Sequence, residues 1–191
     1  MIRLTPFALA ASLLAAPAFA APVDYVFDAS HTQILYSYNH MGFSNTYGMF
    51  GGFEGKISFD AENPAASKVE TEFAVSSLAT GWPERDKHFL TSDFFNAEAN
   101  PMAKFVSTSI EVTGENTAKI TGDLTLNGVT KPVVLDTVMN QAADHPMMKK
   151  PALGFSATAN FLRSDFNLGA FAPVVADEVT IRIEIEALKA E

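Results

Sequence analysis

The stretch that decides the fold is residues 119–136, KITGDLTLNGVTKPVVLD, in which two runs of alternating residues flank an Asn-Gly pair. Asn127 and Gly128 between such runs predict a two-residue hairpin turn of type I′, because both central positions of that turn need positive φ angles. In this register Lys119 faces Asp136 on a mostly polar surface, while the opposite face of both strands is apolar. The hairpin is therefore part of a structure that closes around an apolar interior.

The same alternation recurs along most of the chain, as expected of β-strands. It is clearest in residues 179–187, where Val, Ile and Ala alternate with Thr, Arg and Glu. Further strands are predicted at residues 31–38, 47–60, 68–75, 105–112 and 153–161. The glycines within residues 47–60 predict bulges or sharp coiling, because glycine inside a strand weakens regular pairing.

About eight strands with short connections leave little room for the helices that a parallel sheet requires. An eight-stranded antiparallel barrel and a two-sheet sandwich both fit this pattern. The barrel is favoured, because about eight strands leave space for one small ligand and closure removes exposed strand edges. We therefore predict an all-β fold.

Residues 82–101, WPERDKHFLTSDFFNAEANP, depart from the strand pattern. Pro83 can open a helix, and acidic residues in its first turn and basic residues in its last suit the helix dipole. Ser92 and Asp93 then suit the start of a second short segment. We predict one or two short helices near a barrel mouth, with four apolar side chains facing inward: Phe89, Leu90, Phe94 and Phe95.

Residues 1–20 read as a secretory signal peptide, with the basic Arg3, an Ala-rich apolar run and a final Ala-Phe-Ala. Residues 21–191 are then a single domain in the periplasm of a Gram-negative bacterium. A retained membrane anchor is the alternative, but the apolar run is short for one. The chain has no cysteine, which excludes disulfides and a lipoprotein anchor.

Charge and composition exclude other classes. The net charge is −9 with no basic run, which disfavours nucleic acid and anionic membrane surfaces. No segment after the signal approaches the ~18 consecutive apolar residues of a spanning helix, so stable membrane insertion is not expected. The 16 phenylalanines are enough to fill a thick core or to line a cavity.

Motifs spread from about Val23 to the C-terminus resemble those of the YceI-like family of periplasmic polyisoprenoid-binding proteins. The matching residues are Asp28-x-x-His31-Thr32, His40, Gly48-x-Phe50, 84–90 (ERDKHFL), Phe94, Asn96, Pro101, 122–133 (GDLTLNGVTKPV) and 163–166 (RSDF). Asn167 stands where the family commonly has Gly, and residues 144–150, DHPMMKK, depart most from the pattern. The resemblance implies an extended lipocalin-like antiparallel barrel that holds a long isoprenoid or similar amphiphile in its pore.

On this reading, apolar residues from several segments are the candidate lining of the cavity: Phe43, Tyr47, Phe50, Phe53, Phe89, Phe94, Phe105, Leu124 and Leu126. The candidate head-group residues are Arg85, Asp86, His88 and His31. The alternative for residues 85–88 is a solvated, self-paired helix, because neighbouring charges on short helices are common.

No metal site or cofactor is predicted, because the four histidines lack metal-ligand spacing and no nucleotide or nucleophile motif is present. Three function classes remain open. The first is a carrier of an isoprenoid lipid such as a quinone or prenyl phosphate, the second an enzyme acting on such a lipid, and the third a packed structural or stress-response barrel without a ligand. A homodimer is compatible with each of them.

Overall fold

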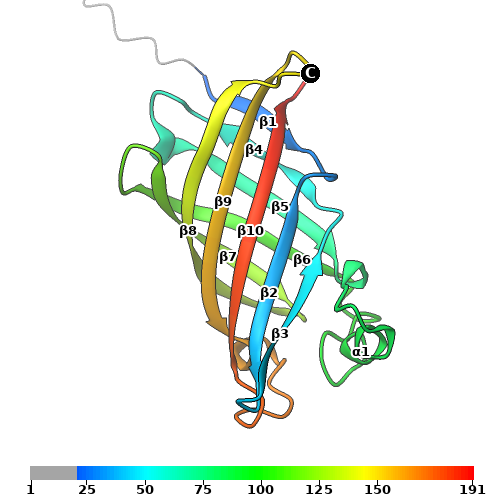
Figure 1. The fold of residues 1–191 in the computed structure, drawn as a ribbon. Helices are drawn as coiled ribbons and strands as arrows, with labels where there is room; N and C mark the ends of the chain where they lie inside the picture. Colours follow the sequence, from blue (N-terminus) through cyan, green and yellow to red (C-terminus); the bar gives the residue numbers. More distant parts are fainter. Residues whose placement is uncertain (1–20) are drawn as a thin grey trace, which may run out of the picture.

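The computed structural model describes residues 21–191, so the predicted signal peptide lies outside the described residues. Almost all of the regular structure is strand (Figure 1). The strands are β1 (Val23–Phe27), β2 (Gln33–His40), β3 (Ser44–Phe50), β4 (Glu54–Phe59), β5 (Lys68–Ala74), β6 (Met102–Val112), β7 (Thr117–Leu126), β8 (Val129–Asp144), β9 (Pro151–Leu162) and β10 (Glu178–Lys189). The helical elements are α1 (Pro83–Phe89) and three short 3₁₀ turns, η1 (Pro64–Ala66), η2 (Val75–Ser77) and η3 (Arg163–Phe166).

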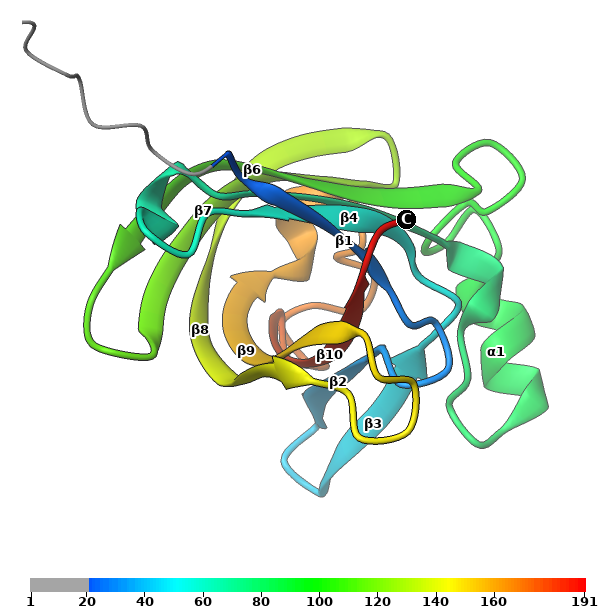
Figure 2. The same ribbon diagram turned by 90° about the horizontal axis from the view of Figure 1, so that it is seen from above.

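These segments close into an eight-stranded antiparallel barrel, which confirms the predicted fold. Both β1 and β2 pair with β10, with Phe27 opposite Ala187 and Gln33 opposite Glu184. They are thus successive halves of one bent strand, and β3 and β4, which pair with β2 and β1, form the next. Viewed from above, the strands form a ring with α1 outside it (Figure 2).

The predicted hairpin is confirmed in every residue pair. Lys119 pairs with Asp136, and their side chains form an ion pair of 2.6 Å on the outer surface. Asn127 and Gly128 form the turn with φ angles of 49° and 73°. The Asn-Gly pair therefore fixes which residues of β7 and β8 face the interior.

The strand predicted at residues 105–112 forms within β6, but its alternation is not continuous. The pairing of β6 with β7 shifts between Ser107 and Ser109, so a bulge lies there. Phe105 and Ile110 consequently both line the interior, although regular alternation would place them on opposite faces.

One segment between β5 and β6, residues 75–101, crosses the lower barrel wall beside β3. Its backbone pairs with β3 through two hydrogen bonds of 2.9 Å between Met49 and Ala79. Helix α1 begins at Pro83 as predicted, whereas the second short segment around Ser92 forms turns and no helix. Phe95 from this segment packs edge-on against Phe50, which attaches the segment to the barrel interior.

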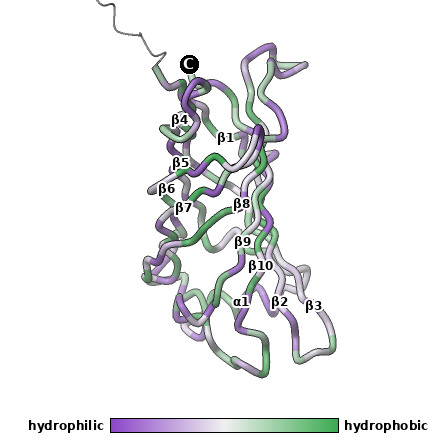
Figure 3. The backbone as a smooth tube through the Cα atoms, turned by 90° about the vertical axis from the view of Figure 1, so that its left-hand side faces the viewer, coloured by the Kyte–Doolittle hydropathy of each residue, from purple (hydrophilic) through white to green (hydrophobic). Residues whose placement is uncertain are grey.

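Apolar side chains fill the inner face of the barrel, and in Figure 3 hydrophobic and hydrophilic residues mix along every wall. Asn167, where the family commonly has Gly, has a φ angle of 57°. Asparagine tolerates this left-handed conformation, so the turn after η3 forms even though Asn replaces the Gly of the family pattern. No helix of the described chain has the length and apolar character needed to cross a membrane.

Candidate ligand-binding cavity

The barrel interior contains two cavities, which we call the lower and upper chambers. The lower chamber, on the side of α1 in Figure 1, has a volume of about 660 Å³, and the upper chamber has about 190 Å³. Four residues line both chambers: Ile34, Phe73, Leu124 and Ile181. These four side chains lie at the boundary between the two spaces, so the chambers adjoin inside the barrel.

Seven of the nine predicted lining residues face these chambers. Those of the lower chamber are Phe50, Phe89, Phe94 and Leu126, those of the upper chamber are Phe53 and Phe105, and Leu124 lines both. Because these residues come from four separated stretches of the chain, closure of the barrel is what brings them together.

The placement of Phe43 and Tyr47 in the cavity is corrected by the structure. Phe43 lies in the turn between β2 and β3 and is 90% exposed. Tyr47 is 62% exposed, because it alternates with Thr46 and Gly48, whose side of β3 faces inward. Neither residue lines a chamber.

Two of the predicted head-group residues, Arg85 and His88, line the lower chamber. The Arg85 guanidinium lies 5.3 Å from the ring centre of Trp82, and among the described residues no carboxylate pairs with it. His88 lies with its Nε2 3.3 Å from Asp93 Oδ2. The Arg85 guanidinium at the chamber wall is thus free to bind an anionic or strongly polar group.

Asp86 has a structural role in place of the predicted ligand contact. Its Oδ1 accepts hydrogen bonds from the backbone N–H of Thr80, at 2.8 Å, and from the Thr80 hydroxyl, at 2.5 Å. Asp86 does not line either chamber. It fixes the chain that leads into α1, and so positions Arg85 beside it.

Arg163 was absent from the predicted site residues but lines the lower chamber. It is buried, and its guanidinium donates hydrogen bonds only to backbone carbonyls, those of Leu168, Ala170, Val175 and Ala176. Burial lowers the pKa of this guanidinium. Arg163 therefore holds the loop between β9 and β10 closed, and adds a second positive charge to the chamber wall. The signal in the sequence was an Arg followed by a loop, residues 166–176, without any other charged residue.

Tyr36 also lines the lower chamber, and its hydroxyl is the one buried side-chain polar atom of the described residues that has no hydrogen-bond partner. The residue is only 8% exposed, and burial raises the pKa of the phenol. The hydroxyl is therefore a permanent donor. An unmet donor of this kind costs about 1–3 kcal/mol and would be satisfied by an oxygen atom brought close to it.

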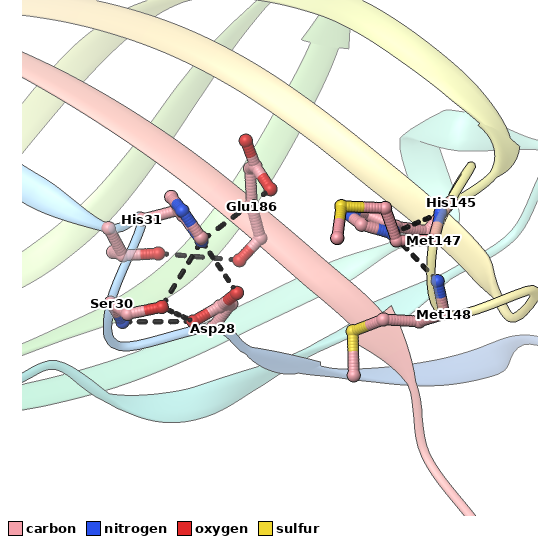
Figure 4. Close-up of polar contacts among 8 residues, drawn as sticks. Asp28, Ser30, His31, His145, Met147, Met148 and Glu186 are labelled. Atoms are coloured by element: carbon pink, nitrogen blue, oxygen red, sulfur yellow. Dashed lines mark hydrogen bonds and ion pairs between the residues drawn. The ribbon is translucent and has the colours of Figure 1, made fainter.

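The fourth predicted head-group residue, His31, lies on the outer wall, at the break between β1 and β2 (Figure 4). Its Nδ1 lies 2.8 Å from Asp28 Oδ2 and 4.0 Å from Glu186 Oε2. Ser30 also donates to Asp28, from its backbone and its hydroxyl. Possible ligand atoms of Asp28, His31 and Glu186 lie within 4.8 Å of one another, but the existing hydrogen bonds explain this cluster as a brace for the strand break.

The divergent stretch around residue 145 forms the turn between β8 and β9, at the end of the barrel opposite the lower chamber (Figures 1 and 4). The backbone N–H groups of Met147 and Met148 donate to His145 Nδ1 at 3.3 and 3.1 Å. Lys150 pairs with Glu191 at 3.0 Å. This loop is therefore closed by its own contacts and lies away from Arg85.

Together these features define a class: closed antiparallel barrels that enclose a mainly apolar cavity with a few polar groups at one end. The model of the YceI-like domain family matches residues 25–187, and the chain belongs to this family. Curated relatives include a UPF0312 protein of Ectopseudomonas mendocina, 39% identical over 97% of both chains, and Protein YceI of Escherichia coli O17:K52:H18, 39% identical over 94% of both.

Solved structures agree on the fold. BcnA of Burkholderia cenocepacia is 26% identical, with a TM-score of 0.76 over 84% of this chain and 98% of that one. A polyisoprenoid binding domain from Saccharophagus degradans is 12% identical, with a TM-score of 0.67 over 88% and 99%. At that identity the second likeness concerns the fold alone.

Proposed function

We propose that this protein binds an isoprenoid lipid, or a similar long-chain amphiphile, inside its barrel and carries it in the periplasm. The observation that supports this most directly is the pair of adjoining apolar chambers, because two such spaces in succession suit a long chain better than a compact ligand. The family points the same way, and the Saccharophagus domain of the same fold is a polyisoprenoid binding domain.

The polar groups of the lower chamber orient the ligand in this proposal. Arg85 and Arg163 supply positive charge, and Tyr36 supplies a buried donor. The head group is therefore expected in the lower chamber, with an oxygen acceptor such as a carbonyl, hydroxyl or phosphate oxygen. The tail extends across the boundary into the upper chamber, where the lining is almost entirely apolar.

The two alternative functions have less support. A packed structural barrel requires that side chains fill the interior at ordinary density, and a chamber of about 660 Å³ does not fit that requirement. The family and the cavity suggest a binding protein rather than an enzyme.

Burial supplies enough free energy for this function. About ten buried carbons of a prenyl tail contribute ~8 kcal/mol at about 0.8 kcal/mol each. Association and ordering cost several kcal/mol, so longer tails should bind more tightly until the chambers are full, reaching roughly micromolar affinity or better.

Native mass spectrometry of the protein purified from a bacterial periplasm tests the proposal directly. We expect an added mass that organic extraction releases as an isoprenoid or similar amphiphile. The control is the Arg85→Ala variant, which should retain a ligand but bind it more weakly. Purified protein that carries no ligand and takes up no prenyl alcohol or quinone of any length would contradict the carrier function.

Fractionation of the cells, with N-terminal sequencing of the purified chain, tests the periplasmic location.

A further inference from the structure

Two loops meet at the lower end of the barrel: the turn between β2 and β3, and the loop between β9 and β10. The backbone of His40 bridges to Val175, and the Ala176 N–H donates to the Asn39 carbonyl at 3.0 Å. Met41 directly follows His40 in the chain, and Val174 directly precedes Val175. The two loops therefore form one surface, although they are more than a hundred residues apart in the chain.

That surface carries large apolar side chains in solvent. The exposed fractions are 90% for Phe43, 64% for Val174, 63% for Phe171 and 47% for Met41. We call these four residues the apolar tip. Scattered exposed apolar residues are ordinary, but four on two paired loops form a patch, and such patches mark interaction sites.

The apolar tip is also free of formal charge, in a protein with 22 acidic and 13 basic residues. Residues 39–46 contain no Asp, Glu, Lys or Arg and only one titratable side chain, that of His40, and residues 168–176 contain none. A surface without charged side chains can be removed from water at little electrostatic cost.

The same two loops line one end of the lower chamber. His40 and Ser44 contribute from the first loop, and Phe171 and Val175 from the second. The exposed apolar surface thus continues into the apolar interior. A lipid that moves between a bilayer and the chamber at this end would pass along apolar contacts and avoid bulk water.

We propose that the apolar tip docks onto the surface of an uncharged or zwitterionic lipid bilayer and opens the chamber to it. The absence of charge at the tip favours the bilayer interface, where exposed aromatic and aliphatic side chains are stabilised. The net charge of −9 predicts weaker docking on anionic bilayers. The proposal rests on the lipid-binding function for its purpose, but its test does not depend on that function.

The chain has no cysteine, so single cysteines can carry an environment-sensitive fluorophore. Val174→Cys places the label on the tip, and Met147→Cys places it at the opposite end of the barrel, where Met147 is 85% exposed. With phosphatidylcholine vesicles, the emission at position 174 should shift to shorter wavelength and rise by about twofold, while position 147 stays unchanged. No response at position 174, an equal response at both positions, or a response at 174 to protein concentration without vesicles would overturn the proposal.

A double variant, Phe43→Ser with Val174→Ser, separates docking from ligand binding, because neither residue lines a chamber. Partitioning of this variant onto phosphatidylcholine vesicles should fall about tenfold. Met147→Ser is the matched control and should partition like the unmodified protein. The affinity for farnesol added from solution should be unchanged in all three proteins. If the unmodified protein does not bind farnesol, the result counts against the carrier function. If the double variant partitions onto vesicles as strongly as the unmodified protein, the result counts against docking.

Discussion

The hydroxyl of Tyr36 lies directly over Gly48, its partner on the neighbouring strand: a Cβ atom built at Gly48 would come within 2.3 Å of the Tyr36 hydroxyl oxygen. The absence of a side chain at Gly48 is what lets the Tyr36 ring pack against β3 beside Phe50, with ring centres 5.6 Å apart. Gly48→Ala should therefore force the ring away from the wall.

We expect Gly48→Ala to lower the free energy of unfolding by about 1–3 kcal/mol, the usual cost of overpacking an interior. Urea denaturation measures this loss. Gly51→Ala is the matched control, because a Cβ at Gly51 meets no atom within 4 Å. Equal stability of the two variants would show that the Tyr36 ring moves aside without cost.

Tyr36→Phe tests whether the buried hydroxyl is unsatisfied. Because it has no partner among the described residues, its removal should raise the stability of the ligand-free protein, by about 1 kcal/mol. Tyr47→Phe, at an exposed position on β3, should change little. Affinity for a quinone should fall in Tyr36→Phe if the hydroxyl donates to a ligand oxygen. A loss of ligand-free stability would show that the hydroxyl already has a partner.

The fold was largely predictable from the sequence, because strand periodicity and a single Asn-Gly turn constrain it locally. Residue types alone did not say which aromatic residues face inward. Tyr47 and Phe50 are three positions apart, so a regular strand cannot direct both to the same face. The alternation of side chains along the strand could therefore have corrected the prediction that Tyr47 faces inward.

The bulge in β6 and the role of Arg163 were not predictable in the same way. The bulge replaces regular pairing at Ser107, Thr108 and Ser109, and β6 itself contains no glycine or proline to mark it. Arg163 is buried by the loop that follows it, and its hydrogen-bond partners are backbone carbonyls, which every residue has. Sequence patterns do not reveal partners of that kind.

The hairpin turn gives a prediction for Gly128. Its φ angle is 73°, and a Cβ atom there would come within 2.9 Å of Asn100 Oδ1. Gly128→Val should cost more than about 1 kcal/mol, because a β-branched residue at positive φ is strained and also contacts Asn100. Thermal and urea denaturation measure the cost. Gly154→Ala, where a Cβ meets only ordinary contacts at 3.9 Å, is the control and should be nearly neutral.

The brace at the strand break predicts a dependence on pH. Hydrogen bonds from Ser30, and then from His31, hold the pKa of Asp28 at about 2, below its ordinary 3.8. The stability that Asp28 contributes is thus present above about pH 4 and is lost as pH falls toward 2. The Asp28 hydrogen bond, with the nearby charges of Asp28 and Glu186, raises the pKa of His31 above 6.5, so the contribution of His31 is lost as pH rises through that higher value.

Asp28→Asn should bring the His31 pKa back toward 6.5, because the carboxylate charge that favours the imidazolium form is removed. It should also reduce the loss of stability between pH 4 and 2. NMR titration of the imidazole measures the first effect, and urea denaturation across pH measures the second. Asp136→Asn, on the outer face of β8, serves as the control for both. An unchanged His31 pKa in Asp28→Asn would show that the brace does not form in solution.

The two-chamber interior predicts a step in affinity with ligand length. Short tails that end in the lower chamber should bind alike in all variants that leave that chamber intact. Longer tails gain ~0.8 kcal/mol per carbon as they enter the upper chamber, until it is full. Ala157 lines the upper chamber only, so Ala157→Leu should occupy part of that space without touching the lower chamber.

We expect Ala157→Leu to leave the affinity for a C10 prenyl alcohol unchanged and to weaken the longest prenyl chains by about tenfold, equivalent to roughly two buried carbons. Thr158→Leu is the matched control. Thr158 is exposed on β9, so this substitution adds a leucine outside the barrel. Calorimetric titration with prenyl alcohols of increasing length measures both. If Ala157→Leu weakens all lengths equally, the ligand does not extend from the lower chamber into the upper one, and if it weakens none, the tail never reaches the upper chamber.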